Sequence, residues 1–178
     1  QLYEFLNGQP ALRRRIQDLP IIRLDNGLHV VPQVDGRNQA FLPGAIITGF
    51  PTVQSNVCST AAALEFLLSI GLTEPDPVDD VIWNILPNYQ ANNVDASNDK
   101  YETDIRRILT AFSTDSKTQR EKLIVELRKS YFVKAIDCGD GSKCVAKPGD
   151  VYIATERLKE LFAGVQNVLL VDNQYSYL

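Results

Sequence analysis

The stretch Leu19-Pro20-Ile21-Ile22-Arg23-Leu24 leads into a turn at Asp25-Asn26-Gly27, continues as Leu28-His29-Val30-Val31-Pro32, and is followed by a short apolar segment at Ala40-Phe41-Leu42-Pro43. The same order returns later as Tyr131-Phe132-Val133-Lys134-Ala135-Ile136, a turn at Cys138-Gly139-Asp140-Gly141, Lys143-Cys144-Val145-Ala146-Lys147-Pro148, and Val151-Tyr152-Ile153-Ala154. Glycine and aspartate tolerate the positive φ angles of hairpin turns, and proline interrupts a strand. Each stretch therefore predicts an antiparallel hairpin, over 20–31 and over 131–147, followed by a short third strand.

Helix signals surround the two β units. We expect residues 1–18 to be helical. Further helices are expected to start at Ser59 or Thr60, Asp76, Asp99, Ser116 and Thr155. Leu2, Phe5 and Leu6 form one apolar patch in the first helix. In the helix that starts at Asp99, apolar residues at helical spacing predict a buried stripe of Tyr101, Ile105, Ile108, Leu109 and Phe112. Gly71 and Gly164 are expected to end helices, Pro87 to stop or kink one, and 168–171 to form a final buried strand.

Helices and antiparallel hairpins follow one another as separate blocks, which is typical of the α+β class. We predict two antiparallel β-hairpin units separated by a bundle of about three to four helices. The break at Glu74-Pro75-Asp76-Pro77 is the best candidate boundary. The expected segments are 1–74 with the first β unit, a helical segment 75–130, and 131–178 with the second β unit, all packed as one compact domain.

Composition limits the class of protein. The chain has 178 residues, of which 44% are hydrophobic and 22% charged, so we expect a folded core. A net charge of −4 argues against a protein held on nucleic acid by bulk positive charge. No apolar run approaches the roughly 20 residues that cross a bilayer, no secretory leader is recognisable, and three cysteines fit a reduced compartment. We expect a cytoplasmic protein and, because methionine is absent, a segment of a longer polypeptide.

One short motif could bind a nucleotide. Asp137-Cys138-Gly139-Asp140-Gly141 matches the Asp-x-Gly-x-Gly box of ATPases of the gyrase, histidine-kinase and chaperone class. That site also needs a helix with a catalytic Glu and, four residues on, an Asn that binds magnesium. Here Glu102 is followed four residues later by Arg106, and no glycine-rich lid comes after the motif. We therefore predict a hairpin turn, and no cofactor in this segment.

The residues that could form a metal or hydrolytic site are few. Cys58, Cys138, Cys144 and His29 do not have the close paired spacing of zinc ligands, so no metal is expected, although Cys138 and Cys144 could be free or could pair on oxidation. Nothing in the sequence places a nucleophile beside His29, and Asp79-Asp80 fits the charge preference of a first helical turn. We predict no catalytic residue and no enzymatic activity in the segment itself.

Two features could contact a partner. Arg13, Arg14 and Arg15 form a basic run, but successive helical positions point about 100° apart, so at most one or two can face the same partner. The three middle helices followed by a hairpin also resemble a winged-helix domain. The cations of the third helix (Lys117, Arg120, Lys122, Arg128 and Lys129) are diluted by Glu121 and Glu126, so this nucleic-acid-binding module is the alternative interpretation.

Five segments carry a family resemblance: Leu19–Leu24 with its turn, Ala40–Pro43, Phe66–Leu72, Ile85–Tyr89 and Pro148–Ile153. Their order resembles a region of large bacterial ATP-binding proteins related to sacsin and to chaperone-type ATPases. In that family the catalytic residues belong to an N-terminal ATPase domain, and none of them corresponds to a residue here. The resemblance implies a non-catalytic structural or protein-interaction module, whose partners are other domains of the same polypeptide or protein clients.

Overall fold

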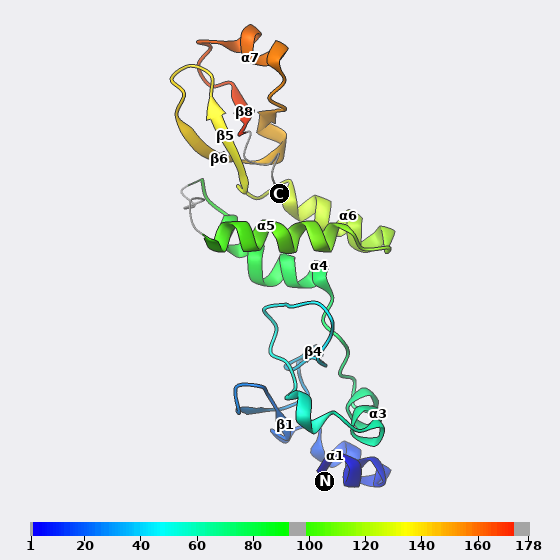
Figure 1. Ribbon diagram of the computed structural model, residues 1–178. Helices are drawn as coiled ribbons and strands as arrows, with labels where there is room; N and C mark the ends of the chain where they lie inside the picture. The colour runs from blue at the N-terminus through cyan, green and yellow to red at the C-terminus, as the bar shows by residue number, and fades with distance from the viewer. Residues whose placement is uncertain (1, 93–98, 173–178) are drawn as a thin grey trace. The chain divides into compact units, whose positions relative to one another are not determined.

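The computed structural model describes residues 2–92 and 99–172 and has the α+β architecture expected from the sequence (Figure 1). The chain divides into two compact units, Gln1–Asp76 (unit 1) and Pro77–Leu178 (unit 2). The finer division into 1–74, 75–130 and 131–178 stays a prediction. None of the helices in the described ranges is long and apolar enough to cross a membrane.

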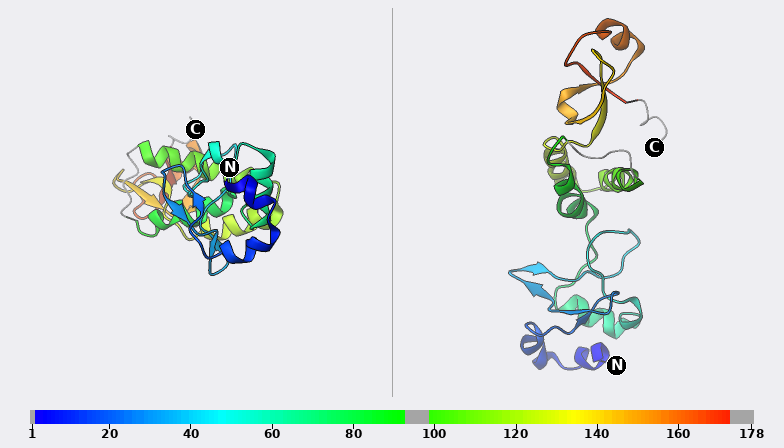
Figure 2. Two further views of the ribbon diagram at one scale, coloured as in Figure 1. Left: turned by 90° about the horizontal axis from the view of Figure 1, so that it is seen from below. Right: turned by 90° about the vertical axis from the view of Figure 1, so that its left-hand side faces the viewer.

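The helices of unit 1 are α1 (Leu2–Asn7), η1 (Pro10–Leu12), α2 (Arg13–Ile16), η2 (Ser55–Val57) and α3 (Ala61–Ser69). The cap of α3 is Thr60, as expected, because its hydroxyl accepts a hydrogen bond from the Ala63 amide at 3.3 Å. Helices α1 and α3 lie side by side (Figure 2), with the rings of Tyr3 and Phe66 stacked at 5.7 Å. Gly71 closes α3 with a φ of +93°, a conformation that favours glycine.

The apolar patch of α1 is buried at only one of its three positions. Leu6 is buried, but Leu2 and Phe5 are exposed, and Tyr3 takes the inner position. The hydroxyl of Tyr3 donates to the Ile21 carbonyl and accepts from the Arg23 amide, each at 3.0 Å, so it satisfies two backbone groups beside the sheet. This polar contact, together with the stacking on α3, turns the Tyr3 side of the helix inward.

The first predicted hairpin is confirmed. β1 (Ile22–Arg23) pairs antiparallel with β2 (His29–Val30), and Gly27 in the turn has a φ of +83°. A second small hairpin, β3 (Gln33–Val34) with β4 (Arg37–Asn38), was not expected. The expected third strand is reduced to a single parallel bridge between Phe41 and Thr52.

Unit 2 begins with a helical run of changing pitch: α4 (Pro77–Asp80), the π-helical η3 (Val81–Ile85) and the 3-10 helix η4 (Leu86–Tyr89). The amide of Leu86 reaches back to the Val81 carbonyl, the wider bond of a π-turn, and the pitch tightens at Pro87. Helices α5 (Asp99–Phe112) and α6 (Lys117–Leu127) follow. Ser116 caps α6 as predicted, whereas Asp99 is the first residue of α5 and not its cap.

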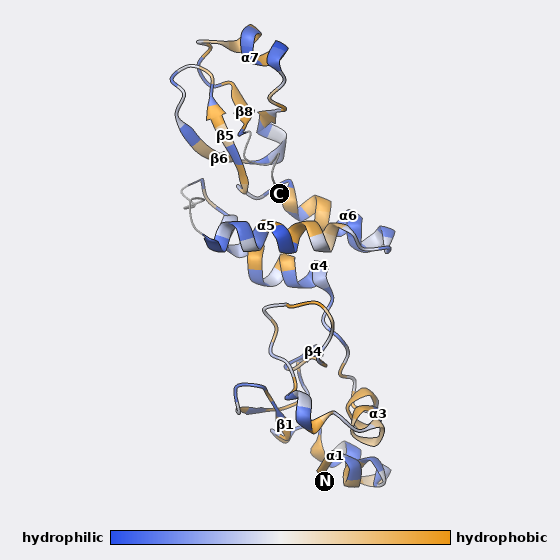
Figure 3. Cartoon of the chain, viewed as in Figure 1, coloured by the Kyte–Doolittle hydropathy of each residue, from blue (hydrophilic) through white to orange (hydrophobic). Residues whose placement is uncertain are grey.

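The buried face of α5 also differs from the prediction at its C-terminal end. Tyr101, Ile105 and Ile108 are buried as expected, but Leu109 and Phe112 are exposed. Asp104 and Ala111 are buried in their place, so an acidic residue lies on the inner side of the helix. Helix α5 carries both hydrophilic and hydrophobic residues (Figure 3). The buried face is set by packing on α4 and η3, and hydrophobicity alone did not identify it.

The sheet of unit 2 has the strand order β6 (Lys143–Ala146), β5 (Val133–Asp137), β8 (Leu169–Val171), β7 (Val151–Tyr152). The second predicted hairpin is confirmed by the antiparallel pairing of β5 with β6. The third strand, β7, does not join this hairpin but pairs parallel with β8. Helix α7 (Glu156–Phe162), capped by Thr155 as predicted, connects β7 to β8.

Candidate functional site

A pocket of about 210 Å³ lies in unit 1, between α1, the β1–β2 hairpin and the start of α3. Its lining is Leu2, Tyr3, Glu4, Ile21, Arg23, His29, Asn56, Val57, Ser59, Thr60 and Ala63. The volume is below the roughly 300–1,000 Å³ typical of sites for cofactors and drug-sized ligands. The pocket can therefore hold a group the size of one side chain, with apolar walls and a polar rim.

Tyr3 connects this pocket to the sheet. Burial raises the pKa of the Tyr3 hydroxyl above its ordinary value, and the hydrogen bond from the Arg23 amide lowers it by less. The phenol is therefore protonated near neutral pH and acts as a fixed part of the wall. Its two hydrogen bonds to backbone groups at Ile21 and Arg23 hold the hairpin against α1.

The pocket brings together residues that the sequence did not connect. His29 is exposed, as expected for a residue after the turn, but Ser59 lies in the same lining. The Ser59 hydroxyl donates to the Asn56 carbonyl at 3.1 Å, and no contact among the described residues links it to the His29 imidazole. A nucleophile needs its base within hydrogen-bonding reach, so this pair lacks the geometry of a hydrolytic site.

The predicted interaction residues Arg13, Arg14 and Arg15 lie together in the short helix α2, outside the pocket lining. Arg13 is half-buried, and its Nε has no hydrogen-bond partner among the described residues. Arg15 is exposed, and the side chain of Arg14 lies outside the described part of the structure. A role for the three residues in partner binding stays a prediction.

The Asp137–Gly141 segment forms the hairpin turn that the sequence predicted. One carboxylate oxygen of Asp137 accepts from the Gly139 amide at 2.7 Å, and the other accepts from the Asn167 amide at 3.2 Å. An added Cβ at Gly139 would lie 2.8 Å from Cα of Gln166, so glycine is needed here for a close backbone approach. Asp137 thus ties the β5–β6 turn to the segment before β8, and both of its oxygens have backbone donors.

The three cysteines are free and half-buried. Burial raises the pKa of the thiols of Cys58 and Cys144, which keeps both protonated at neutral pH. In the described ranges, no three His, Cys, Asp or Glu side chains gather in a way that could hold a metal ion.

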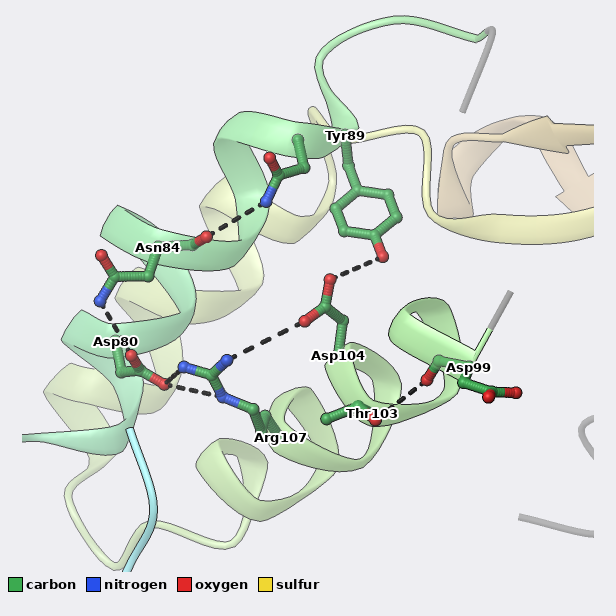
Figure 4. Close-up of polar contacts among 8 residues, drawn as sticks. Asp80, Asn84, Tyr89, Asp99, Thr103, Asp104 and Arg107 are labelled. Atoms are coloured by element: carbon green, nitrogen blue, oxygen red, sulfur yellow. Dashed lines mark hydrogen bonds and ion pairs between the residues drawn. The ribbon is translucent and has the colours of Figure 1, made fainter. Parts of the chain in front are cut away.

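A buried polar network in unit 2 links α4 to α5 (Figure 4). The Arg107 guanidinium donates to Oδ2 of Asp80 through Nε, at 3.1 Å, and through Nη2, and it faces Asp104 at 4.0 Å. Asn84 donates to Oδ1 of Asp80 at 2.9 Å, and the Tyr89 hydroxyl donates to Asp104 at 3.0 Å. Asp79 and Asp80 both lie in the first turn of α4, as the sequence indicated, but only Asp79 forms an exposed pair, with Lys122 at 2.7 Å, whereas Asp80 is buried.

This network resembles a catalytic carboxylate pair only in composition. Asp80 and Asp104 are 2% and 3% exposed, and each already accepts hydrogen bonds from fixed donors. Neither residue is part of the pocket lining. We interpret the network as the polar link that fixes α5 against α4 and η4.

A second candidate surface lies around α7, and we name it the α7 surface. It consists of Tyr152, Ile153, Leu158, Leu161, Phe162 and Val165. None of the residues of α7 is buried, although its apolar positions recur at helical spacing; Leu161 is 65% and Ile153 77% exposed. The rings of Tyr152 and Phe162 contact each other at 5.6 Å, which joins β7 to the helix.

Comparisons with protein-family models, with curated proteins and with solved structures gave no match to this chain. The two surfaces described above, the pocket of unit 1 and the α7 surface of unit 2, are the candidates for function. Both offer apolar contact area.

Proposed function

We propose that this chain is a non-catalytic protein-interaction module of a larger, chaperone-like ATP-binding protein. The α7 surface carries the proposal. Tyr152, Ile153 and Leu161 are each more than half exposed. Contiguous exposed apolar patches are a common mark of a protein-binding surface. The contact would be made with other domains of the same polypeptide or with protein clients.

The alternative, a winged-helix-like nucleic-acid-binding module, is favoured by one observation. The run α4–η4, then α5, α6 and the β5–β6 hairpin, follows the element order of that fold. Four of the five cations that would contact phosphate argue against it. Lys117, Lys122 and Lys129 each form an ion pair, with Glu121, Asp79 and Glu126 respectively, and Arg120 donates to the Thr114 carbonyl. Electrophoretic shift with duplex DNA at low and moderate salt separates the two proposals, because tight binding that weakens steeply with salt belongs to the alternative.

The interaction proposal is tested by suppression of aggregation. Insulin B chain released by dithiothreitol is the probe, with light scattering as the readout and no nucleotide present. The wild-type chain should slow scattering at near-equimolar ratios, and the double variant Ile153→Lys/Leu161→Lys should lose this effect. Ile47→Lys is the matched control, because Ile47 is also highly exposed but lies in unit 1, outside the pocket lining. Circular dichroism verifies that all variants are folded.

The contact with other domains is tested on the parent polypeptide. Amide hydrogen exchange over 151–165 should be slower in the parent than in the isolated chain, because a docked surface opens less often. The proposal is wrong if exchange over these residues is unchanged and the wild-type chain also fails to slow aggregation. The coding sequence next to this segment provides an independent test, since the proposal requires an upstream ATPase domain with its glycine boxes.

A further inference from the structure

Strand β2 forms one edge of a small sheet in unit 1. On one side, β1 pairs with β2. On its other side, Leu24, the residue after β1, forms an antiparallel bridge with Val53. The sheet extends further through the parallel bridge between Phe41 and Thr52. In the described part of the chain, no strand pairs with the outer side of β2.

The pairing register points the backbone of His29 outward. The Leu24 amide donates to the Leu28 carbonyl at 2.8 Å, and Ile22 is registered with Val30. Hydrogen-bonded and non-hydrogen-bonded pairs alternate along an antiparallel ladder, so Arg23 and His29 form a non-bonded pair. The amide and carbonyl of His29 therefore face away from β1, and no backbone partner for them occurs among the described residues. Such an edge is a template for another strand.

The pocket lies on the same hairpin as this edge. Arg23 and His29 are cross-strand partners, so their side chains share one face of the hairpin, and both line the pocket. Ile21, Val57 and Ala63 form the apolar wall. A strand added beside His29 would direct every second side chain to this face.

Arg23 offers a positive charge to an acidic ligand at the pocket. The side chain of Arg23 is exposed, and no ion pair to it occurs among the described residues. The first turn of α3, a helix of nine residues, starts beside the lining residue Thr60 and adds positive partial charge. Glu4 is the one carboxylate in the described lining, and it already has an interaction partner.

We propose that the pocket and the β2 edge together bind an extended peptide. Its backbone pairs with His29, an apolar side chain enters the pocket, and a carboxylate two residues away contacts Arg23. Alternate residues of a strand share a face, so the ligand has the pattern apolar-x-acidic. This inference rests on the proposed interaction function and specifies the class of partner for unit 1.

The test uses fluorescein-labelled Thr-Leu-Thr-Glu-Thr and the full 178-residue chain, with fluorescence anisotropy as the readout. Replacement of Glu in the peptide by Lys should weaken binding at least about tenfold, since a charge-assisted hydrogen bond is lost. Arg23→Gln should weaken binding of the Glu peptide about tenfold but leave binding of a Gln peptide unchanged. Arg106→Gln is the matched control, because Arg106 is exposed, belongs to unit 2 and does not line the pocket.

The backbone contact is tested separately. The peptide amides are methylated one at a time. Binding should be abolished only when the methylated amide is the one that pairs with His29, because the methyl group removes a hydrogen-bond donor of the ladder. Equal binding of the Glu and Lys peptides, or no binding of any of the peptides, overturns the inference. Aggregation suppression that persists in that case would leave the proposed function standing, so the two failures are distinguishable.

Discussion

The Arg107 guanidinium on α5 forms a buried ion pair with Asp80 on α4, although the two residues are 27 positions apart in the sequence. Asp80 is almost fully buried, whereas about a quarter of the Arg107 side chain (26%) stays exposed. The pair also keeps Asp104 close to a positive charge on the inner face of α5. Two aspartates are thereby accommodated in a predominantly apolar core.

Removal of Arg107 should therefore destabilise unit 2 strongly. Arg107→Ala leaves the Asp80 carboxylate buried without its cation, and the expected loss in free energy of unfolding is about 3 kcal/mol. Urea denaturation followed by the fluorescence of Trp83, the single tryptophan of the chain, measures it. Lys122→Ala is the matched control: it removes the exposed pair with Asp79 and should cost less than about 1 kcal/mol. Equal losses in the two variants would contradict the assignment of Asp80–Arg107 as the structural link.

Tyr3 should make the stability of unit 1 sensitive to alkaline pH. Its pKa is raised in the folded state, so the unfolded chain loses the phenolic proton first as the pH rises. The stabilising contribution is complete below about pH 10, the ordinary tyrosine pKa, and is lost as the pH rises through the folded pKa. Urea midpoints followed by circular dichroism should fall above about pH 10 more steeply in the wild type than in Tyr3→Phe. Parallel pH profiles would show that Tyr3 is not the responsible group.

The close backbone approach at the β5–β6 turn should make Gly139 intolerant of a side chain. Gly139→Ala places a methyl group 2.8 Å from Cα of Gln166 and 3.0 Å from a carboxylate oxygen of Asp137, and it should cost about 1–3 kcal/mol. Gly149→Ala is the control, because an added Cβ there meets nothing within 4 Å, and it should change stability by less than about 0.5 kcal/mol. Thermal or urea unfolding of both variants measures the difference. Similar stabilities would mean that the turn can open without loss of packing.

The turn at Asp137 should not bind nucleotide. Both carboxylate oxygens already accept backbone hydrogen bonds, and Arg106 stands where a magnesium-binding Asn would be required. Calorimetric titration with Mg-ATP is expected to give no binding heat, for the wild type and for Asp137→Asn alike. Micromolar affinity that Asp137→Asn abolishes would turn this hairpin into a nucleotide site.

Local signals in the sequence determined much of the secondary structure. Both hairpins and the caps at Thr60, Ser116 and Thr155 were predicted correctly, because turns and caps depend on the conformations and hydrogen bonds of a few neighbouring residues. The α+β class followed from the order of these elements. The hairpin turn at Asp137–Gly141 was predicted for the same reason, since its glycines serve a local geometry.

Only the tertiary structure decided which faces are buried and which distant residues meet. Leu109 and Phe112 are exposed while Asp104 is buried, because a charged side chain can enter the core once Arg107 and Tyr89 supply its partners. The pocket likewise unites α1, the β1–β2 hairpin and the start of α3, three segments that no spacing rule connects. Periodicity reports the hydrophobicity of one element at a time. Burial depends on the surface that another element presents, and that surface exists only in the folded chain.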